Sequence, residues 1–322
     1  MRRLCLTAGL LVLAGCPSNM LVSPPGNGAI KDLTPAATGS ADSFHTPLDA
    51  TLSPDGKMAF FIAIEGDLAA VYSASAPANG APTKLHAGEP LVSPFGVDIS
   101  FDGKTLILSD PGAQLNADAD ERGELFSLST TGGAPQKIDG ASGYRARGVA
   151  VVRQAGADLA FFTGRDPATK EPGVFKVPLA GGAVTVVAKG GELRDLSGLA
   201  VVSDGTVFVV DADAEGGDAR LMKISGGTVS VMKSPISVGF PAGVALSQDE
   251  KTVLVSARVP EAGTDAVLRI PVGGGDTEVV TTGIDQFSEP AGLHRARSVD
   301  AFIWADSRAN GKGTVFVINK QQ

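Results

Sequence analysis

Residues 96–110 read GVDISFDGKTLILSD, and this stretch decides the fold. A glycine and an aliphatic residue open a short run that favours a β-strand. Asp102-Gly103 then supplies the positive φ angle of a tight hairpin, and a second apolar run follows. The opening pair recurs at Gly96-Val97, Gly148-Val149, Gly198-Leu199, Gly243-Val244 and Gly292-Leu293, with steps of 52, 50, 45 and 49 residues. An earlier copy opens at Thr46-Pro47-Leu48-Asp49, where Asp49 takes the place of the glycine.

A repeat of about fifty residues that is built only of strands predicts the blade of a propeller. The six copies therefore predict an all-β, six-bladed β-propeller, and no long window has the 3.6-residue apolar spacing of a helix. The last copy ends with its third strand at 315–318, so its outer strand is missing. Because an open sheet edge favours aggregation, we expect residues 29–33 to pair with that third strand and close the ring.

The N-terminus has the order of features of a secretory signal. Arg2 and Arg3 form a basic start, and residues 4–14 are an apolar run of eleven, too short to span a bilayer. Residues 13–16 read Leu-Ala-Gly-Cys and resemble a bacterial lipobox, in which the cysteine is lipidated and becomes the first residue. We expect a lipoprotein signal peptide over 1–15, a lipidated tether over 16–28 and the propeller over 29–322. The alternative is an ordinary secretory signal with a chance cysteine.

Lipidation at Cys16 predicts an exported protein that is anchored to a membrane without a transmembrane helix. Pro17 follows the cysteine, and the aspartate that usually marks retention at the inner membrane is absent, which favours the outer membrane over the inner membrane. Removal of Arg2 and Arg3 leaves 25 basic against 35 acidic residues, a formal charge of −10. Such an acidic chain is not expected to bind nucleic acid, or anionic lipid by charge.

In a propeller, the loops from each outer strand to the next inner strand share one face with the loops from second to third strands. Ligands usually meet this channel face at the mouth of the central channel. Charged residues recur in both sets of loops, and a ring of mixed charge suits a polar ligand or a metal. The ligand-binding candidates are Asp110, Arg147, Arg165, Asp211, Arg258 and Asp306. The alternative is that loop polarity only keeps backbone groups solvated.

Two acidic loops are candidates for calcium, because alternating oxygen ligands around one centre suit a hard cation. The first, over 116–124, offers Asp118 and Asp120, and the second, over 211–218, offers Asp213 and Asp218. Neither loop has the full spacing of a calcium motif, so a solvated acidic loop is the alternative. No other cofactor is predicted. His45, His86 and His294 are the only histidines and lack metal-ligand spacing, and there is no nucleophile elbow or phosphate loop.

From Thr46 to Ile318 the chain resembles six-bladed propellers of the senescence-marker-protein/gluconolactonase and NHL-repeat group. The stretches Pro94-Phe95-Gly96-Val97, Leu196-Ser197-Gly198-Leu199, Pro241-Ala242-Gly243-Val244 and Pro290-Ala291-Gly292-Leu293 carry this resemblance. Residues 175–182, FKVPLAGG, are also similar to the repeats of Tol-Pal-type propellers.

The resemblance to lactonases implies a metal at the channel mouth, held in part by Asn and Asp directly before the opening glycine. Those positions hold Phe95, Arg147, Ser197, Ala242 and Ala291, which offer no carboxylate or amide oxygen. A quinone-dependent sugar dehydrogenase is a further six-bladed type, but so few histidines leave no clear proton acceptor.

The sequence therefore favours a lipid-anchored binding or scaffold module that meets a protein partner or a small polar ligand through its channel face, rather than an enzyme. The alternative is a metal-dependent hydrolase of the lactonase type with relocated ligands, for which Asp110, Asp211 and Asp306 would have to converge near the axis.

Overall fold

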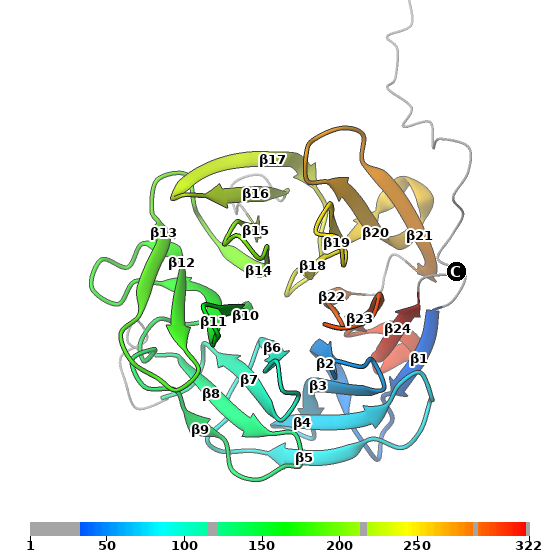
Figure 1. The fold of residues 1–322 in the computed structure, drawn as a ribbon. Coiled ribbons are helices and arrows are strands. Elements are labelled where there is room, and N and C mark those ends of the chain that lie inside the picture. Colours follow the sequence, from blue (N-terminus) through cyan, green and yellow to red (C-terminus); the bar gives the residue numbers. More distant parts are fainter. Residues whose placement is uncertain (1–32, 115–121, 213–217, 286–288, 320–322) are drawn as a thin grey trace, which may run out of the picture.

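The structure is a computed structural model that describes residues 33–114, 122–212, 218–285 and 289–319. Six antiparallel four-stranded sheets stand around a central channel, as the sequence predicts (Figure 1). In each sheet the first strand of the repeat lies innermost. Two short 3₁₀ turns, η2 (Pro260–Ala262) and η3 (Ala309–Gly311), follow second strands. None of the helical segments in these four ranges is long and apolar enough to cross a membrane.

Blades one to three follow one another in chain order, each from its inner to its outer strand. Blade one contains β2 (His45–Leu52), β3 (Met58–Glu65), β4 (Leu68–Ser75) and β5 (Thr83–Ala87). Blade two contains β6 (Gly96–Ile99), β7 (Thr105–Asp110), β8 (Glu124–Ser129) and β9 (Gln136–Lys137). Blade three contains β10 (Val149–Gln154), β11 (Ala157–Arg165), β12 (Pro172–Pro178) and β13 (Thr185–Lys189).

Blades four and five repeat the pattern, and blade six takes its outer strand from the other end of the described chain. Blade four contains β14 (Leu196–Val201), β15 (Val207–Asp211), β16 (Ala219–Ser225) and β17 (Thr228–Ile236). Blade five contains β18 (Val244–Leu246), β19 (Thr252–Val259), β20 (Thr264–Pro271) and β21 (Glu278–Asp285). Blade six contains β22 (Pro290–Arg295), β23 (Ala301–Asp306), β24 (Thr314–Asn319) and β1 (Leu33–Thr38).

The ring closes where the sequence predicts, but with a later strand. β1 pairs antiparallel with β24, the third strand of blade six, with Leu33 opposite Ile318 and Thr38 opposite Thr314. The expected segment 29–33 shares only Leu33 with this strand, and residues 29–32 lie outside the described ranges. Pro35 argues against a strand when only the sequence is read, because proline cannot donate a backbone hydrogen bond. It fits here because β1 is an outer strand with a register shift between Pro35 and Ala37.

The second strands are nearly continuous apolar runs because neighbouring blades cover both of their faces. All five residues of β15 are buried, and so are all six of β23. Trp304 of β23 packs with Leu254 and Val267 of blade five, which places it between two blades.

Side-chain hydroxyls near the ends of second strands link adjacent blades. Thr163 Oγ1 of blade three donates to the carbonyl of Ser197 in blade four at 2.8 Å. Ser256 Oγ of blade five donates to the carbonyl of Ala291 in blade six at 2.7 Å. The repeated glycines lie beside these links. A Cβ added to Gly148 would lie 2.5 Å from the Ser197 carbonyl oxygen, so the inner strands approach too closely for a side chain there.

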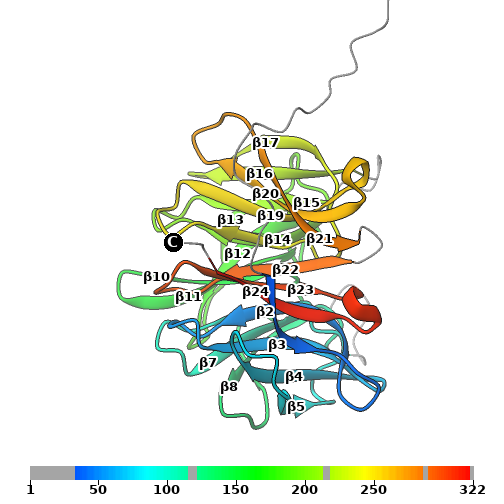
Figure 2. The same ribbon diagram turned by 90° about the vertical axis from the view of Figure 1, so that its right-hand side faces the viewer.

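Seen from the side, the hairpins between first and second strands and the loops between second and third strands leave by opposite faces (Figure 2). The hairpin between β10 and β11 projects on one side, which we call the hairpin face. The turns η2 and η3 project on the other, the channel face, with the loops between second and third strands. Inner strands run from the channel face to the hairpin face, so their first and last residues lie at opposite ends of the channel.

Candidate functional site

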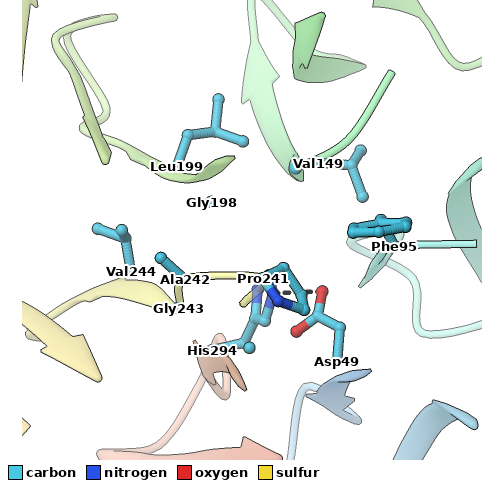
Figure 3. A pocket seen from close by; sticks show the side chains of 12 residues that line it. Asp49, Phe95, Val149, Gly198, Leu199, Pro241, Ala242, Gly243, Val244 and His294 are labelled. Atoms are coloured by element: carbon cyan, nitrogen blue, oxygen red, sulfur yellow. Dashed lines mark hydrogen bonds and ion pairs between the residues drawn. The ribbon is translucent and has the colours of Figure 1, made fainter. Parts of the chain in front are cut away.

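The first residues of the inner strands surround a narrow hollow of about 270 Å³ in the channel (Figure 3). Its wall is mostly backbone, because glycine opens blades two to six at this level. The side chains that reach it include Phe95, Pro241, Asp49 and His294. Asp49 and His294 bring the titratable chemistry to this part of the channel.

Asp49 and His294 form an ion pair across the junction of blades one and six. His294 Nε2 lies 3.1 Å from Asp49 Oδ2, which also accepts the backbone N–H of Val97 at 2.8 Å (Figure 3). Gly292 makes room for this pair, since a Cβ there would collide with the Asp49 carboxylate. Burial opposes the charged imidazolium, but the charge and hydrogen bond of Asp49, with the charge of Asp98, outweigh it and raise the pKa of His294.

A second ion pair, Asp98 with Arg297, lies nearer the hairpin face. Arg297 Nη2 is 3.1 Å from Asp98 Oδ2, and Arg297 Nη1 donates to the carbonyl of Val151 at 2.9 Å. Asp98 Oδ2 also accepts the backbone N–H of Val151 at 2.6 Å, and Asp98 Oδ1 accepts the Thr51 hydroxyl at 3.1 Å. The pair therefore joins a segment of blade six to blades one, two and three.

Asp110, Asp211 and Asp306 do not bond to one another; each carboxylate binds backbone N–H groups of its own blade. Asp110 accepts those of Val92 and Ser93 at 2.7 and 3.1 Å. Asp211 accepts the N–H of Asp195 at 2.7 Å and pairs with Arg220 at 2.8 Å.

Asp306 Oδ1 accepts the N–H groups of Glu289, Arg308 and Ala309 at 2.8 to 3.2 Å. The three acids thus hold the loop before the inner strand, or the loop after the second strand, in place. Because each of them binds donors of its own blade, they form no common centre near the axis.

Of the predicted arginines, Arg147 and Arg165 come together on the channel face. Arg147 Nη1 lies 2.7 Å from Asp195 Oδ1, and Arg165 Nη2 lies 3.8 Å from the same oxygen. With Arg145 they line a shallow cleft of about 260 Å³ between blades three and four. Arg258 is placed elsewhere, paired with Glu289 at the junction of blades five and six.

Asp306 has a second acid beside it, Asp265 on β20. Both oxygens of Asp265 and Oδ2 of Asp306 are buried without a hydrogen-bond donor among the described residues. Burial, followed by the charge of Asp306, raises the pKa of Asp265 to about 8, and burial also raises the pKa of Asp306. Two adjacent carboxylates resist joint ionisation, so Asp265 carries a proton at neutral pH.

Two phenylalanines lie together at the channel mouth. The rings of Phe95 and Phe240 meet edge to face, with centroids 5.1 Å apart, and the guanidinium of Arg147 lies 6.0 Å from the Phe240 ring. Phe240 leaves 44% of its surface exposed. An exposed aromatic ring beside an arginine, on loops held by rigid strands, is the composition of a binding surface.

The lactonase metal does not fit the residues at the channel mouth. Phe95 and Ala242 stand where the resemblance requires ligands, and they line the hollow with carbon atoms. Within residues 33–114, 122–212, 218–285 and 289–319, no cluster of three or more His, Cys, Asp or Glu side chains suits a metal.

Several predicted residues cannot be placed. Cys16, Asp118, Asp120 and Asp213 lie outside the described ranges, and Asp218 is exposed just before β16. The channel residues Asp49, Asp98, His294 and Arg297 were not among the sequence candidates. These residues could have been found in the sequence, because three of them stand at positions that depart from the repeat. Asp49 replaces the opening glycine, and two residues after that glycine His294 and Asp98 stand where blades three to five have alanine.

No family model matches the chain, and no curated protein matches it. Among solved structures, a gluconolactonase from Xanthomonas campestris is similar with a TM-score of 0.57 at 13% identity, over 92% of this chain and 98% of that one. TolB from Acinetobacter baumannii is similar with a TM-score of 0.56 at 16% identity, over 74% of this chain. The match spans 55% of that TolB chain, about half its length.

A nidogen/laminin complex contains a further chain with this fold, at a TM-score of 0.53 and 16% identity, over 72% of this chain and 80% of that one. At these identities the likeness extends to the fold alone. The chain is a six-bladed β-propeller whose structural neighbours include both gluconolactonase and TolB-like proteins.

Proposed function

We propose that the chain is an exported, lipid-anchored propeller that binds a protein partner through its channel face and carries out no chemistry there. The observation that carries this proposal is the pair Phe95 and Phe240 with Arg147 beside it. Aromatic and arginine side chains dominate the energetic centres of protein interfaces, because they bury a large area at a small cost in conformational entropy.

The rigidity of the surrounding loops supports the same proposal. Asp110, Asp211 and Asp306 bind loop backbone, and Asp195 holds Arg147 and Arg165 in fixed positions. A surface ordered before binding loses less entropy when a partner docks. A propeller of the same fold also occurs in a nidogen/laminin complex, which is an assembly of proteins.

The anchor rests on the N-terminal pattern. Arg2 and Arg3, the apolar run over 4–14 and the box ending at Cys16 support export and lipidation, and Pro17 favours the outer membrane. A tether over 16–28 would hold the propeller near the membrane, where a membrane-associated or periplasmic protein would meet its channel face. The proposed anchor predicts that Cys16→Ser releases the protein from the membrane fraction of its host.

Site-specific photo-crosslinking in the native host tests the binding surface. A benzophenone amino acid at position 240 should crosslink to one defined protein. The same probe at Val186, equally exposed at 45% on the outer strand β13, should not. Phe95→Ala should weaken the crosslink from position 240, because the edge-to-face contact that positions the ring is lost. Equal crosslinking from 186 and 240, or none from 240, would reject the channel face as the binding surface.

The lactonase alternative has no specific support in the donor set at the channel mouth. A stoichiometric divalent ion in the purified protein, together with hydrolysis of a lactone, would support the lactonase alternative. Calcium at the acidic loops 116–124 and 211–218 stays a separate prediction, which the same metal analysis would check.

A further inference from the structure

The channel has a second hollow at its hairpin-face end, away from the proposed binding surface. Its volume is about 470 Å³, and the later residues of the inner strands of blades three to five, 150–152, 199–201 and 244–246, line it. Four charged or titratable side chains, Asp98, His294, Arg295 and Arg297, also line it. An opening lined by four charged or titratable side chains beside aliphatic residues is the composition of a small-ligand site.

Three of these four side chains, Asp98, His294 and Arg297, are already paired. Arg297 pairs with Asp98 at 3.1 Å, and His294 pairs with Asp49 at 3.1 Å. Each cation at this level other than Arg295 therefore has a carboxylate in contact with it.

Arg295 has only carbonyl partners. Its Nε donates to the carbonyl of Leu246 at 2.9 Å, and its Nη1 donates to those of Ala296 and Arg297 at 2.6 and 3.3 Å. Its Nη2 makes no hydrogen bond to any residue that the structure describes, and no described carboxylate lies within 4.0 Å of its guanidinium. Among the residues that the structure describes, Arg295 is the one cation lining the hollow that lacks a contacting anion.

The direction of the Arg295 pKa shift agrees with the lack of a contacting carboxylate. Burial lowers the pKa of Arg295, and the charge of Arg297 acts in the same direction, against the longer-range attraction of Asp300 and Glu250. The buried Nε of Arg297 also has no acceptor among the described residues. A partly buried guanidinium without a contacting anion is costly, so an anion that entered this end of the channel would stabilise it.

We propose that the hairpin-face end of the channel binds a small carboxylate, which Arg295 receives through its free Nη2 edge. A guanidinium suits a planar carboxylate better than a spherical ion, because two parallel N–H bonds match two oxygens. Ala150, Val152, Ala200 and Leu246 line the same hollow with carbon atoms, so the ligand carries a short apolar chain.

Calorimetric titration of the full-length protein with butyrate tests the site. Wild type should bind one butyrate per chain and should ignore butyramide, the neutral analogue of similar shape. Arg295→Gln should weaken butyrate binding at least tenfold, because the counter-charge is removed. Arg153→Gln is the matched control. Arg153 belongs to the same face, is half-exposed and pairs with Asp158 at 2.6 Å, so its loss should leave butyrate binding unchanged.

Several outcomes would overturn the proposal. These are no butyrate binding by wild type, equal binding of butyramide, or equal affinity in the Arg295→Gln variant. If Arg295→Gln does not fold, Arg295→Lys serves instead, and it should weaken binding because lysine lacks the planar pair of donors. Crosslinking from position 240 is independent of these measurements, so either proposal can fail while the other stands.

Discussion

At the scale of single residues, the chemistry of the channel comes from positions that break the repeat. Asp49 takes the place of a glycine in blade one, and Gly292 of blade six leaves the space that its carboxylate fills. His294 then reaches the same carboxylate from the next blade. A departure at one position is thus matched by a neighbour across the blade junction. The ion pair consequently belongs to the junction of two blades, and neither blade could form it alone.

The buried acids Asp265 and Asp306 give the protein a pH-dependent stability of unusual sign. A carboxyl pKa raised to about 8 means that the folded state keeps a proton that the unfolded chain releases near its ordinary pKa of 3.8. This contribution is therefore complete below pH 4 and is lost as the pH rises from there to about 8.

The variant Asp265→Asn cannot ionise, and its amide can donate to Asp306 Oδ2, which lacks a donor. Its thermal unfolding midpoint should exceed that of wild type at pH 9, by on the order of 5 °C, and the difference should shrink at pH 5. Differential scanning calorimetry at both pH values measures this. A variant that is less stable than wild type at pH 9 would contradict the shared-proton interpretation.

At the scale of the elements, the opening glycine is a packing requirement of the inner strands. The Ser197 carbonyl oxygen would lie 2.5 Å from a Cβ at position 148, and the Arg147 carbonyl oxygen equally far from one at position 96. The copies of the repeat therefore keep a glycine at each position where the backbones of adjacent inner strands are in contact. Asp49 is tolerated because Gly292 replaces that contact with open space.

Gly148→Ala should accordingly destabilise the protein by about 1 to 3 kcal/mol, since the inner strands must separate to admit the methyl group. Gly273→Ala is the matched control, because it lies in a hairpin turn of blade five and a Cβ there meets nothing within 4 Å. Urea unfolding of both variants measures the difference. Equal stability of the two variants would show that the inner strands yield to a methyl group without cost.

The acids that end second strands show where reasoning from sequence stops. Asp110, Asp211 and Asp306 are the last residues of the second strands β7, β15 and β23, and the lactonase alternative required them to share one site near the axis. Each acid is buried beside backbone N–H groups and binds those groups, because a buried carboxylate binds the donors nearest to it. The three side chains therefore do not share a site. The identity of those donors depends on loop conformations that no periodicity encodes.

At the scale of the whole molecule, the blade count, the strand order and closure by an N-terminal strand were all predictable, because each follows from the spacing of Gly-aliphatic pairs. The closing strand was placed too early, since Pro35 disguises a run whose inward residues are two alanines. The channel ion pairs were not predicted. Asp49 and His294 are 245 residues apart, and only the closed ring brings them together.

Closure itself should dominate the stability of the ring, since β1 covers the edge of β24 that would otherwise be open. Ala37 is fully buried in β1, in a cluster with Val315 and Val317 of β24. Ala37→Asp should therefore destabilise the protein by roughly 3 kcal/mol, and amide exchange along β24 should accelerate most. Leu68→Asp, at a position 54% exposed on blade one, is the control and should change neither quantity. If exchange in Ala37→Asp rises equally in all six blades, the ring unfolds as one cooperative unit and its closure does not open locally.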